Sequence, residues 1–259
     1  MPEPSLEAAL LRIREDGYDG VETGAPVDAD DRRALRDRLD KLGLDMIVQV
    51  WTVGKTPAEH ARSLEEQYRR AVELRPRLVN VQSGRDTYSV EENAAIYRRG
   101  SALEAELGVP LAQEIHRGRA SFCIPAALAL LQAVPMTRLT ADFSHWCCVH
   151  ESLLQDQVEA LDKVINHCVH IHARVGHAEG PQVSDPRAPE WRPALRAHLG
   201  WWQRIADQRK AAGAEVLTIT PEFGPPDYMQ TLPFTRQPVN DLRSVNLAMR
   251  EILAKELII

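Results

Sequence analysis

Cysteine is scarce in this chain of 259 residues, and its four copies form no recognisable framework. They are Cys123, Cys147, Cys148 and Cys168, and their spacing contains neither a C-x-x-C motif nor the pattern of a disulfide-rich domain. We therefore expect reduced thiols. The adjacent pair Cys147 and Cys148 could bind a soft metal ion, but a role as small buried side chains is favoured because cysteine packs well.

Long apolar runs and an excess of positive charge are also missing. No uncharged apolar run approaches the roughly 18 to 20 residues that span a bilayer, and residues 1–4 do not begin a signal peptide. These absences predict a soluble cytoplasmic protein without a membrane partner. The net charge of −6 disfavours nucleic acid as a partner, because binding to phosphates relies on clustered Lys and Arg.

The composition that remains is that of a globular protein. Hydrophobic residues make up 44% of the chain and charged residues 26%, which is enough apolar material to bury a sizeable core. The length is typical of a single (β/α)₈ barrel, which needs about 250 residues. We predict one domain over residues 1–259.

Amphipathic helical stretches alternate with short apolar runs, which is the pattern of βα units around a parallel sheet. Capping boxes at 56–59 and 89–92 and stop signals at Gly43 and Gly108 place several helix ends. The expected helices cover residues 5–16, 29–42, 56–74, 89–107, 122–133, 151–164, 188–212 and 238–256. The expected strands cover residues 19–23, 44–50, 78–82, 110–115, 137–142, 167–172 and 215–220.

This alternation predicts an α/β fold, a (β/α)₈ TIM barrel. Such a barrel normally opens with a strand, yet here the helix over residues 5–16 comes first. We expect either that the start omits a first strand or that the barrel closes irregularly.

Polar residues stand at the carboxyl ends of four successive strands, where the active sites of βα barrels lie. They are Glu114, Asp142, His172 and Glu222. Three carboxylates at close quarters would repel one another unless a divalent cation compensated them, and this donor set suits Mn²⁺, Mg²⁺, Co²⁺ or Zn²⁺. Each residue alone is more simply a loop cap or an ion-pair partner, but the set of four favours a metal site.

The segments around these residues resemble the xylose isomerase-like TIM-barrel superfamily, the sugar phosphate isomerase/epimerase family included, over almost the whole chain. The matching segments are 17–22, 114–117, 142–145, 170–172 and 221–224. The superfamily contains ketose epimerases, hydroxypyruvate isomerases, inosose dehydratases and DNA repair enzymes of the endonuclease IV type. The resemblance implies one divalent ion, with Mn²⁺ favoured, held by the four strand-end residues.

The resemblance also implies roles for individual residues. In the epimerase branch the first and last glutamates, here Glu114 and Glu222, exchange a proton with the substrate carbon. His145 matches a substrate-binding or second-metal histidine, of which substrate contact is favoured. The metal would polarise a carbonyl and its neighbouring hydroxyl, acidify the C–H between them and stabilise the enediolate.

The endonuclease IV branch needs three zinc ions, with extra histidines on the middle strands and an Asp-x-His element. At the middle-strand positions this chain has Gln49 or Trp51 and Gln82, and the element 185–187 reads Asp-Pro-Arg. We therefore expect no trinuclear nuclease site.

Further substrate contacts are expected next to the four ligands. The segment 173–190 is longer than the usual loop of an α/β unit and is predicted to cover the site; it supplies Arg174 and Gln182. His116 and Arg117 follow the first glutamate. The arginine could hold an anionic substrate group or pair with a carboxylate.

The tryptophans allow two interpretations. Trp146, near a strand end, could stack on a sugar ring or pack beneath a loop. Trp191, Trp201 and Trp202 fall on the longest predicted helix, where a place in the core is favoured over a subunit interface.

Three functions are compatible with this sequence. The first is a metal-dependent isomerase or epimerase of a sugar or related polyhydroxylated carbonyl compound. The second is a lyase or dehydratase that acts on a keto-sugar or inosose and expels a β-substituent from the same enediolate. The third is a non-catalytic barrel that binds a sugar or a partner protein. The expected partner is a small sugar-like molecule, and a homodimer or homotetramer stays open.

Overall fold

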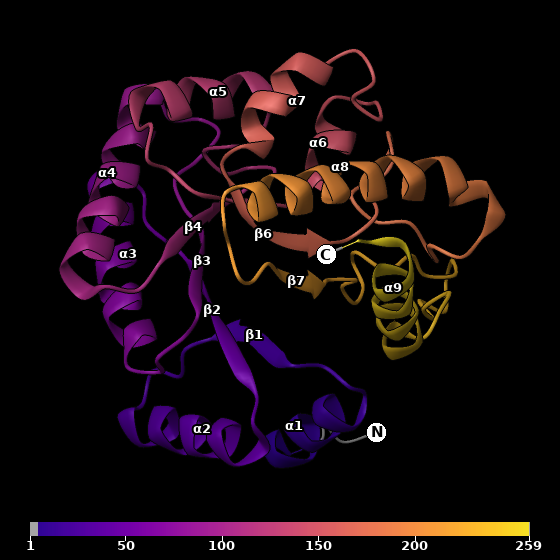
Figure 1. The fold of residues 1–259 in the computed structure, drawn as a ribbon, viewed down its shortest axis with the longest axis horizontal. Helices are drawn as coiled ribbons and strands as arrows, with labels where there is room; N and C mark the ends of the chain where they lie inside the picture. The colour runs from indigo at the N-terminus through magenta and orange to yellow at the C-terminus, as the bar shows by residue number, and fades with distance from the viewer. Residues whose placement is uncertain (1–4, 259) are drawn as a thin grey trace. The chain divides into compact units, whose positions relative to one another are not determined.

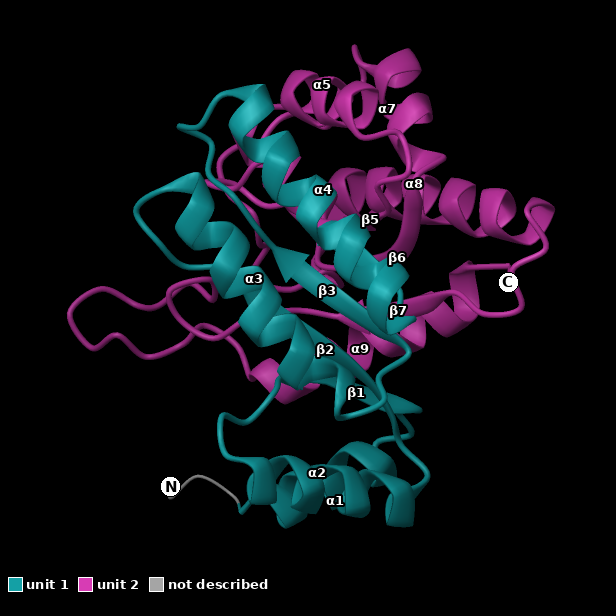
Figure 2. Ribbon diagram, turned by 90° about the vertical axis from the view of Figure 1, so that its left-hand side faces the viewer, with its two compact units in different colours: residues 1–113 teal, residues 114–259 magenta. Residues whose placement is uncertain are grey.

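Helices and parallel strands alternate along the chain in a computed structural model that describes residues 5–258 (Figure 1). The chain falls into two compact units, Met1–Gln113 and Glu114–Ile259, which are coloured separately in Figure 2. The prediction that residues 1–4 begin no signal peptide lies outside the described residues. No helix within the described range is both long enough and apolar enough to cross a membrane.

The first unit consists of helix–strand repeats with a parallel sheet. Its strands pair in chain order, β1 with β2, β2 with β3 and β3 with β4. Its helices are α1 (Leu6–Glu15), α2 (Ala29–Leu42), α3 (Pro57–Val72) and α4 (Val90–Leu107). Its strands are β1 (Gly20–Gly24), β2 (Asp45–Trp51), β3 (Leu78–Gln82) and β4 (Leu111–Glu114), of which β4 runs to the first residue of the second unit.

Local signals set the helix ends of this unit, as predicted. Both capping boxes are formed: Thr56 and Ser89 accept from the backbone of the third helical residue, whose glutamate reaches back. Gly43 and Gly108 end α2 and α4 with φ of 62° and 74°, a conformation that residues with a Cβ rarely adopt. These two predicted helix ends are confirmed.

The second unit continues the alternation. Its strands are β5 (Leu139–Ala141), β6 (Cys168–Ala173) and β7 (Thr218–Pro221), which pair in parallel and in chain order. Its helices are α5 (Ile124–Ala133), α6 (Phe143–Val149), α7 (Val158–Ile165), α8 (Arg192–Ala211) and α9 (Leu242–Glu256), and a 3₁₀ turn, Pro189–Trp191, precedes α8.

The predicted helix over residues 151–164 is wrong in its extent. A separate helix, α6, starts directly after β5, and α7 begins only at Val158. The N-cap residue of α6 is Asp142, a residue type common at helix starts. Its side chain makes no capping hydrogen bond, because Arg174 and Ser144 bind its two oxygens. Among residues 5–258 the seven predicted strands are therefore accompanied by nine α-helices rather than eight.

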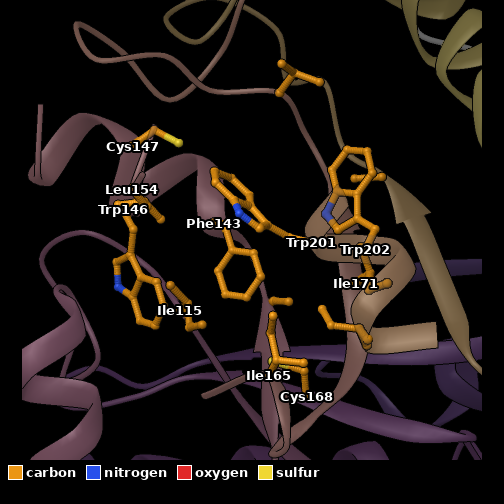
Figure 3. Close-up of a cluster of buried hydrophobic side chains, with 14 of the residues drawn as sticks. Ile115, Phe143, Trp146, Cys147, Leu154, Ile165, Cys168, Ile171, Trp201 and Trp202 are labelled. Carbon is orange, nitrogen blue, oxygen red and sulfur yellow. The ribbon is translucent and has the colours of Figure 1, made fainter. Parts of the chain in front are cut away.

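Aromatic side chains form the centre of the second unit's core (Figure 3). The ring of Phe143 lies 5.3 Å from Trp146 in a stacked arrangement and 5.7 Å from Trp201 edge-on. Trp202 and Cys147 are buried in the same cluster. The prediction of a core position is confirmed for Trp201 and Trp202, while Trp191 is partly exposed and packs against the cluster. All four cysteines are free.

A buried histidine fixes the loop after β6 to α8. The Nδ1 atom of His198 lies 2.9 Å from the Ala194 carbonyl oxygen, and the Gly176 backbone N–H donates to Nε2 at 3.2 Å. The imidazole is thus neutral, with its proton on Nδ1. Burial lowers the pKa of His198 from 6.5 to about 4, because the interior disfavours the charged ring.

This histidine makes stability depend on pH. Because its folded pKa lies below 6.5, the unfolded chain binds more protons between pH 6.5 and about 4, so the neutral ring's contribution is lost as pH falls through that window. Over this whole window, the shifted pKa of His198 lowers the free energy of unfolding by about 3 kcal/mol. In His198→Gln we expect the free energy of unfolding, measured in urea at pH 7, 6 and 5, to fall less with acid than in the wild type. Equal pH slopes would contradict this, and His167→Gln, directly before β6, is the control.

Gly176 is a second fixed point of the loop. An added Cβ would lie 2.6 Å from the carbonyl oxygen and 2.7 Å from the Cα of Ser144, which are backbone atoms of α6. We expect Gly176→Ala to cost about 1 to 3 kcal/mol by overpacking, which lowers the melting temperature by several degrees. Gly200→Ala, where nothing lies within 4 Å, should leave the melting temperature unchanged or raise it. Equal melting temperatures for the two variants would refute the steric argument.

Candidate metal centre

The four predicted ligands all lie in the second unit. Glu114 is the last residue of β4, Asp142 and Glu222 directly follow β5 and β7, and His172 is the penultimate residue of β6. Strands β4 to β7 are neighbours in one sheet, and β5, β6 and β7 pair in parallel, with His172 opposite Thr220 and a register shift between Leu139 and Thr140. Their carboxyl ends therefore bring these side chains to one edge of the sheet.

Hydrogen bonds to the backbone hold the two glutamates in place. The Ser121 hydroxyl donates to the Glu114 carbonyl oxygen at 2.8 Å. The residue after Glu222, Phe223, donates its N–H to the side chain of Asn246 on α9 at 2.9 Å, and Asn246 donates back to the Phe223 carbonyl at 3.0 Å. Each carboxylate thus sits on a fixed piece of main chain.

Three of the four predicted ligands form one group. Glu114, His172 and Glu222 each offer a ligand atom, and these atoms lie within 4.8 Å of one another. His172 Nδ1 lies 2.8 Å from Glu222 Oε2 and 3.8 Å from Glu114 Oε1. Glu114 and His172 are buried, while Glu222 is partly exposed. Two carboxylates and an imidazole with one accessible side suit a divalent ion that keeps open positions for other ligands.

Asp142 lies apart from that group of three and is bound to other side chains. It is fully buried; Arg174 donates to its Oδ2 and the Ser144 hydroxyl to its Oδ1. His145 Nε2 lies 3.4 Å from Oδ2. Burial raises the pKa of Asp142 to about 6, and the Arg174 guanidinium opposes that shift.

Arg174 lies between the carboxylates of Asp142 and Glu222. Its Nη2 lies 3.5 Å from Glu222 Oε2 and 2.9 Å from His145 Nε2, and its Nε donates to the Ser144 hydroxyl at 3.2 Å. The side chain is only 2% exposed. Although burial disfavours its charge, Asp142 and Glu222 keep the pKa of Arg174 above its ordinary value, so the guanidinium stays charged.

Two histidines line the group on the side of Glu114. The rings of His116 and His145 lie 3.9 Å apart, and both residues offer a ligand atom within 4.8 Å of one from Glu114. Burial lowers the pKa of His116 to about 4. Burial, followed by the nearby His116 and Arg174, lowers the pKa of His145 well below its usual value. Neutral imidazoles here can hydrogen-bond an uncharged hydroxyl or hold a second cation.

Tyr228 is a site residue that the sequence analysis missed. Its ring lies 4.4 Å from the Arg174 guanidinium and 5.6 Å from that of Arg117, and its hydroxyl lies 3.3 Å from His116 Nε2. Burial raises the pKa of this phenol, which therefore stays protonated at neutral pH. The only sequence signal was its place six residues after Glu222, in a segment without helix or strand character.

Two predicted substrate contacts are engaged elsewhere. The side-chain amide of Gln182 donates to the Gly224 carbonyl at 3.0 Å and accepts from the Gly224 N–H at 2.7 Å, which uses both ends of the amide. Trp146 is fully buried in the hydrophobic core, with its Nε1–H donating to the Ser121 carbonyl at 3.0 Å. Gln182 thus joins two loops, and Trp146 supports the main chain near Glu114.

Comparison with known proteins assigns the fold. The model of the xylose isomerase-like TIM-barrel family matches residues 10–185. The chain therefore belongs to this family and has its TIM-barrel fold. No curated protein sequence matches the chain.

Solved structures match nearly the whole chain at low identity. A D-tagatose 3-epimerase-like protein is 14% identical with a TM-score of 0.67, covering 97% of this chain and 93% of that one. The 3-keto-D-glucoside 4-epimerase YcjR from E. coli is 12% identical with a TM-score of 0.64, covering 97% and 95%. The probable 3-DHS dehydratase AsbF from Bacillus anthracis is 14% identical with a TM-score of 0.61, covering 97% and 94%. At these identities the likeness concerns the fold.

The donor set leads to a direct test of metal binding. We expect His172→Gln to weaken Mn²⁺ binding at least about 100-fold in titration calorimetry, because loss of even an outer-shell partner costs about 10- to 100-fold. His177→Gln, on the loop after β6, should bind Mn²⁺ like the wild type. Unchanged Mn²⁺ affinity in His172→Gln would exclude this residue as a ligand.

Proposed function

We propose that this chain is a divalent-metal-dependent isomerase or epimerase of a sugar or a related polyhydroxylated carbonyl compound. The observation that carries the proposal is the grouping of Glu114 and Glu222 around His172 within 4.8 Å. A metal ligand set and two candidate proton-transfer groups thereby coincide. The structural matches to a D-tagatose 3-epimerase-like protein and to a 3-keto-D-glucoside 4-epimerase support the same reaction class.

Glu114, Asp142, His172 and Glu222 would hold one divalent ion, with Mn²⁺ favoured and Mg²⁺, Co²⁺ or Zn²⁺ also suited to this donor set. When bound, it would polarise the substrate's carbonyl and neighbouring hydroxyl and so acidify the C–H between them.

The chain's own residues supply the remaining chemistry. One carboxylate, Glu114 or Glu222, removes the proton at its Oε atom, and a carboxyl group returns it to the substrate carbon. For an epimerisation the two carboxylates divide these steps, one for each face of the carbon. The distance of at most 4.8 Å between their ligand atoms supports this assignment, because both carboxylates would then reach one substrate carbon.

Neighbouring side chains orient the substrate. His145 and His116 can hydrogen-bond its hydroxyls as neutral imidazoles, and the Tyr228 hydroxyl adds a donor beside His116. Arg174 and Arg117 supply positive charge next to the developing negative charge.

A lyase or dehydratase is the second candidate. It would use the same proton abstraction and then expel a β-substituent, and the structural match to a probable dehydratase favours keeping it. A carbohydrate-binding barrel without catalysis would keep the fold and lose the proton transfer.

The organisation around this function is also part of the proposal. The family match runs across the boundary between the two units without interruption, which supports a single TIM-barrel domain over residues 1–259. The partner would be a small sugar-like substrate, in a cytoplasmic protein that carries four free thiols and could assemble as a homodimer or homotetramer.

Proton exchange tests the proposal directly. The Mn²⁺-loaded protein, incubated with a panel of ketoses and keto-sugars in D₂O, should place deuterium on a carbon next to the carbonyl, detected by mass spectrometry. Glu222→Gln should lose about 10²- to 10⁴-fold of the exchange rate, because a general base contributes that much. Glu179→Gln, on the loop after β6, is the control.

The products separate the alternatives. Epimers of unchanged mass, apart from deuterium, support the isomerase or epimerase, whereas loss of water or of another leaving group supports the lyase. Bound metal without exchange or elimination for any member of the panel would leave a non-catalytic barrel and reject the proposal.

A further inference from the structure

A charged guanidinium is built into the carboxylate set of the candidate metal centre. Arg174 is the first residue after β6, and it is buried against two of the four proposed ligands, Asp142 and Glu222. Ser144 and the ring of Tyr228 hold the same guanidinium through other contacts. The arginine therefore does not depend on Asp142 alone for its position.

Arg174 balances part of the negative charge of the site. Glu114, Asp142 and Glu222 together carry three negative charges when ionised. Arg174 cancels one of them, and a divalent cation would cancel the other two, so the loaded centre would be electrically neutral. Without either cation, repulsion among charges in a poorly solvated site would be severe.

Arg174 and a divalent ion would also compete for the same carboxylate, Asp142. The three residues whose ligand atoms already lie together are Glu114, His172 and Glu222. The fourth, Asp142, has its Oδ2 bound by Arg174 and its Oδ1 by Ser144. For Asp142 to join the others as a ligand, its Oδ2 must exchange the guanidinium for the ion.

We propose that Arg174 is an internal counter-ion that competes with the divalent cation for Asp142. In the metal-free protein it occupies that carboxylate and keeps the site folded; in the loaded protein it gives up Oδ2, stays held by Ser144 and Tyr228, and sets the charge of the centre to zero. The inference rests on the proposed metal-dependent function and assigns Arg174 a positioning role rather than a catalytic one.

Metal affinity is the measurement that tests this, independently of any substrate. Mn²⁺ dissociation constants of the full chain are measured by titration calorimetry after removal of bound metal with EDTA. Arg174→Met should bind Mn²⁺ at least about tenfold more tightly than the wild type, because a competing positive charge has been removed. Arg174→Lys keeps the charge but loses the guanidinium contacts to Ser144 and Tyr228, so its Mn²⁺ affinity should lie between those of the wild type and Arg174→Met.

Two further variants separate competition for Asp142 from general repulsion. In an Asp142→Asn background most of the gain from Arg174→Met should disappear, since the contested carboxylate is gone. Arg117→Met removes a cation that also lies over Tyr228 but contacts none of the four proposed ligands in any described ion pair. Its Mn²⁺ affinity should stay within about twofold of the wild type.

Thermal unfolding tests whether Arg174→Met still folds. In EDTA, Arg174→Met should melt well below the wild type because Asp142 is left as a buried unpaired charge, and Mn²⁺ should restore more stability to it than to the wild type. If Arg174→Met does not fold without metal, the double variant with Asp142→Asn, which removes both charges, should fold. Failure of the double variant as well would contradict the counter-ion role.

The outcomes distinguish this inference from the proposed function. Wild-type binding of Mn²⁺ with equal or weaker binding by Arg174→Met overturns the counter-ion role and leaves the proposed function intact. Tighter binding by Arg174→Met beside a wild type that binds Mn²⁺ but exchanges no substrate proton upholds the role and rejects the function. If neither the wild type nor Arg174→Met binds Mn²⁺, both the counter-ion role and the proposed function are overturned.

Discussion

Repulsion among three carboxylates is the constraint around which the second unit is organised. Glu114, Asp142 and Glu222 come from three different strand ends, and the first two are buried. Charges in such a place need partners of opposite sign or hydrogen bonds that stabilise them. Arg174, Ser144 and the neighbouring imidazoles provide these partners, of which Arg174 comes from the loop after β6 and Ser144 from α6.

The scaffold holds these partners by contacts that lie outside the site. His198 on α8 and the backbone of Ser144 both contact Gly176, two residues beyond Arg174. Asn246 on α9 holds the residue after Glu222. Arg174 and Glu222 therefore stand within two residues of a fixed backbone position, which restricts them to the small displacements that precise positioning tolerates.

The parts that were predictable from sequence are those with local causes. Capping boxes, glycine helix ends and the alternation of strands and helices depend on near neighbours in the chain, and the four strand-end residues followed from the strand positions. The helix α6 starts after Asp142, whose side chain is bound by Arg174 and Ser144 instead of capping the helix, and Tyr228 follows no periodic pattern, so neither was predicted. Gln182, in the long loop after β6, and Trp146, near a strand end, were predicted as substrate contacts. Their hydrogen-bond partners, Gly224 and Ser121, are distant in sequence, so these bonds left no local signal.

The double hydrogen bond between Gln182 and the Gly224 peptide couples two segments that border the site. One follows β6 and begins with Arg174; the other follows β7 and includes Tyr228. An amide that pairs with a peptide in this way acts like one rung of a sheet, and Gln230 adds a third bond to the Gln182 carbonyl. A displacement of one segment would therefore be transmitted directly to the other, so Arg174 and Tyr228 sit on segments that would shift together.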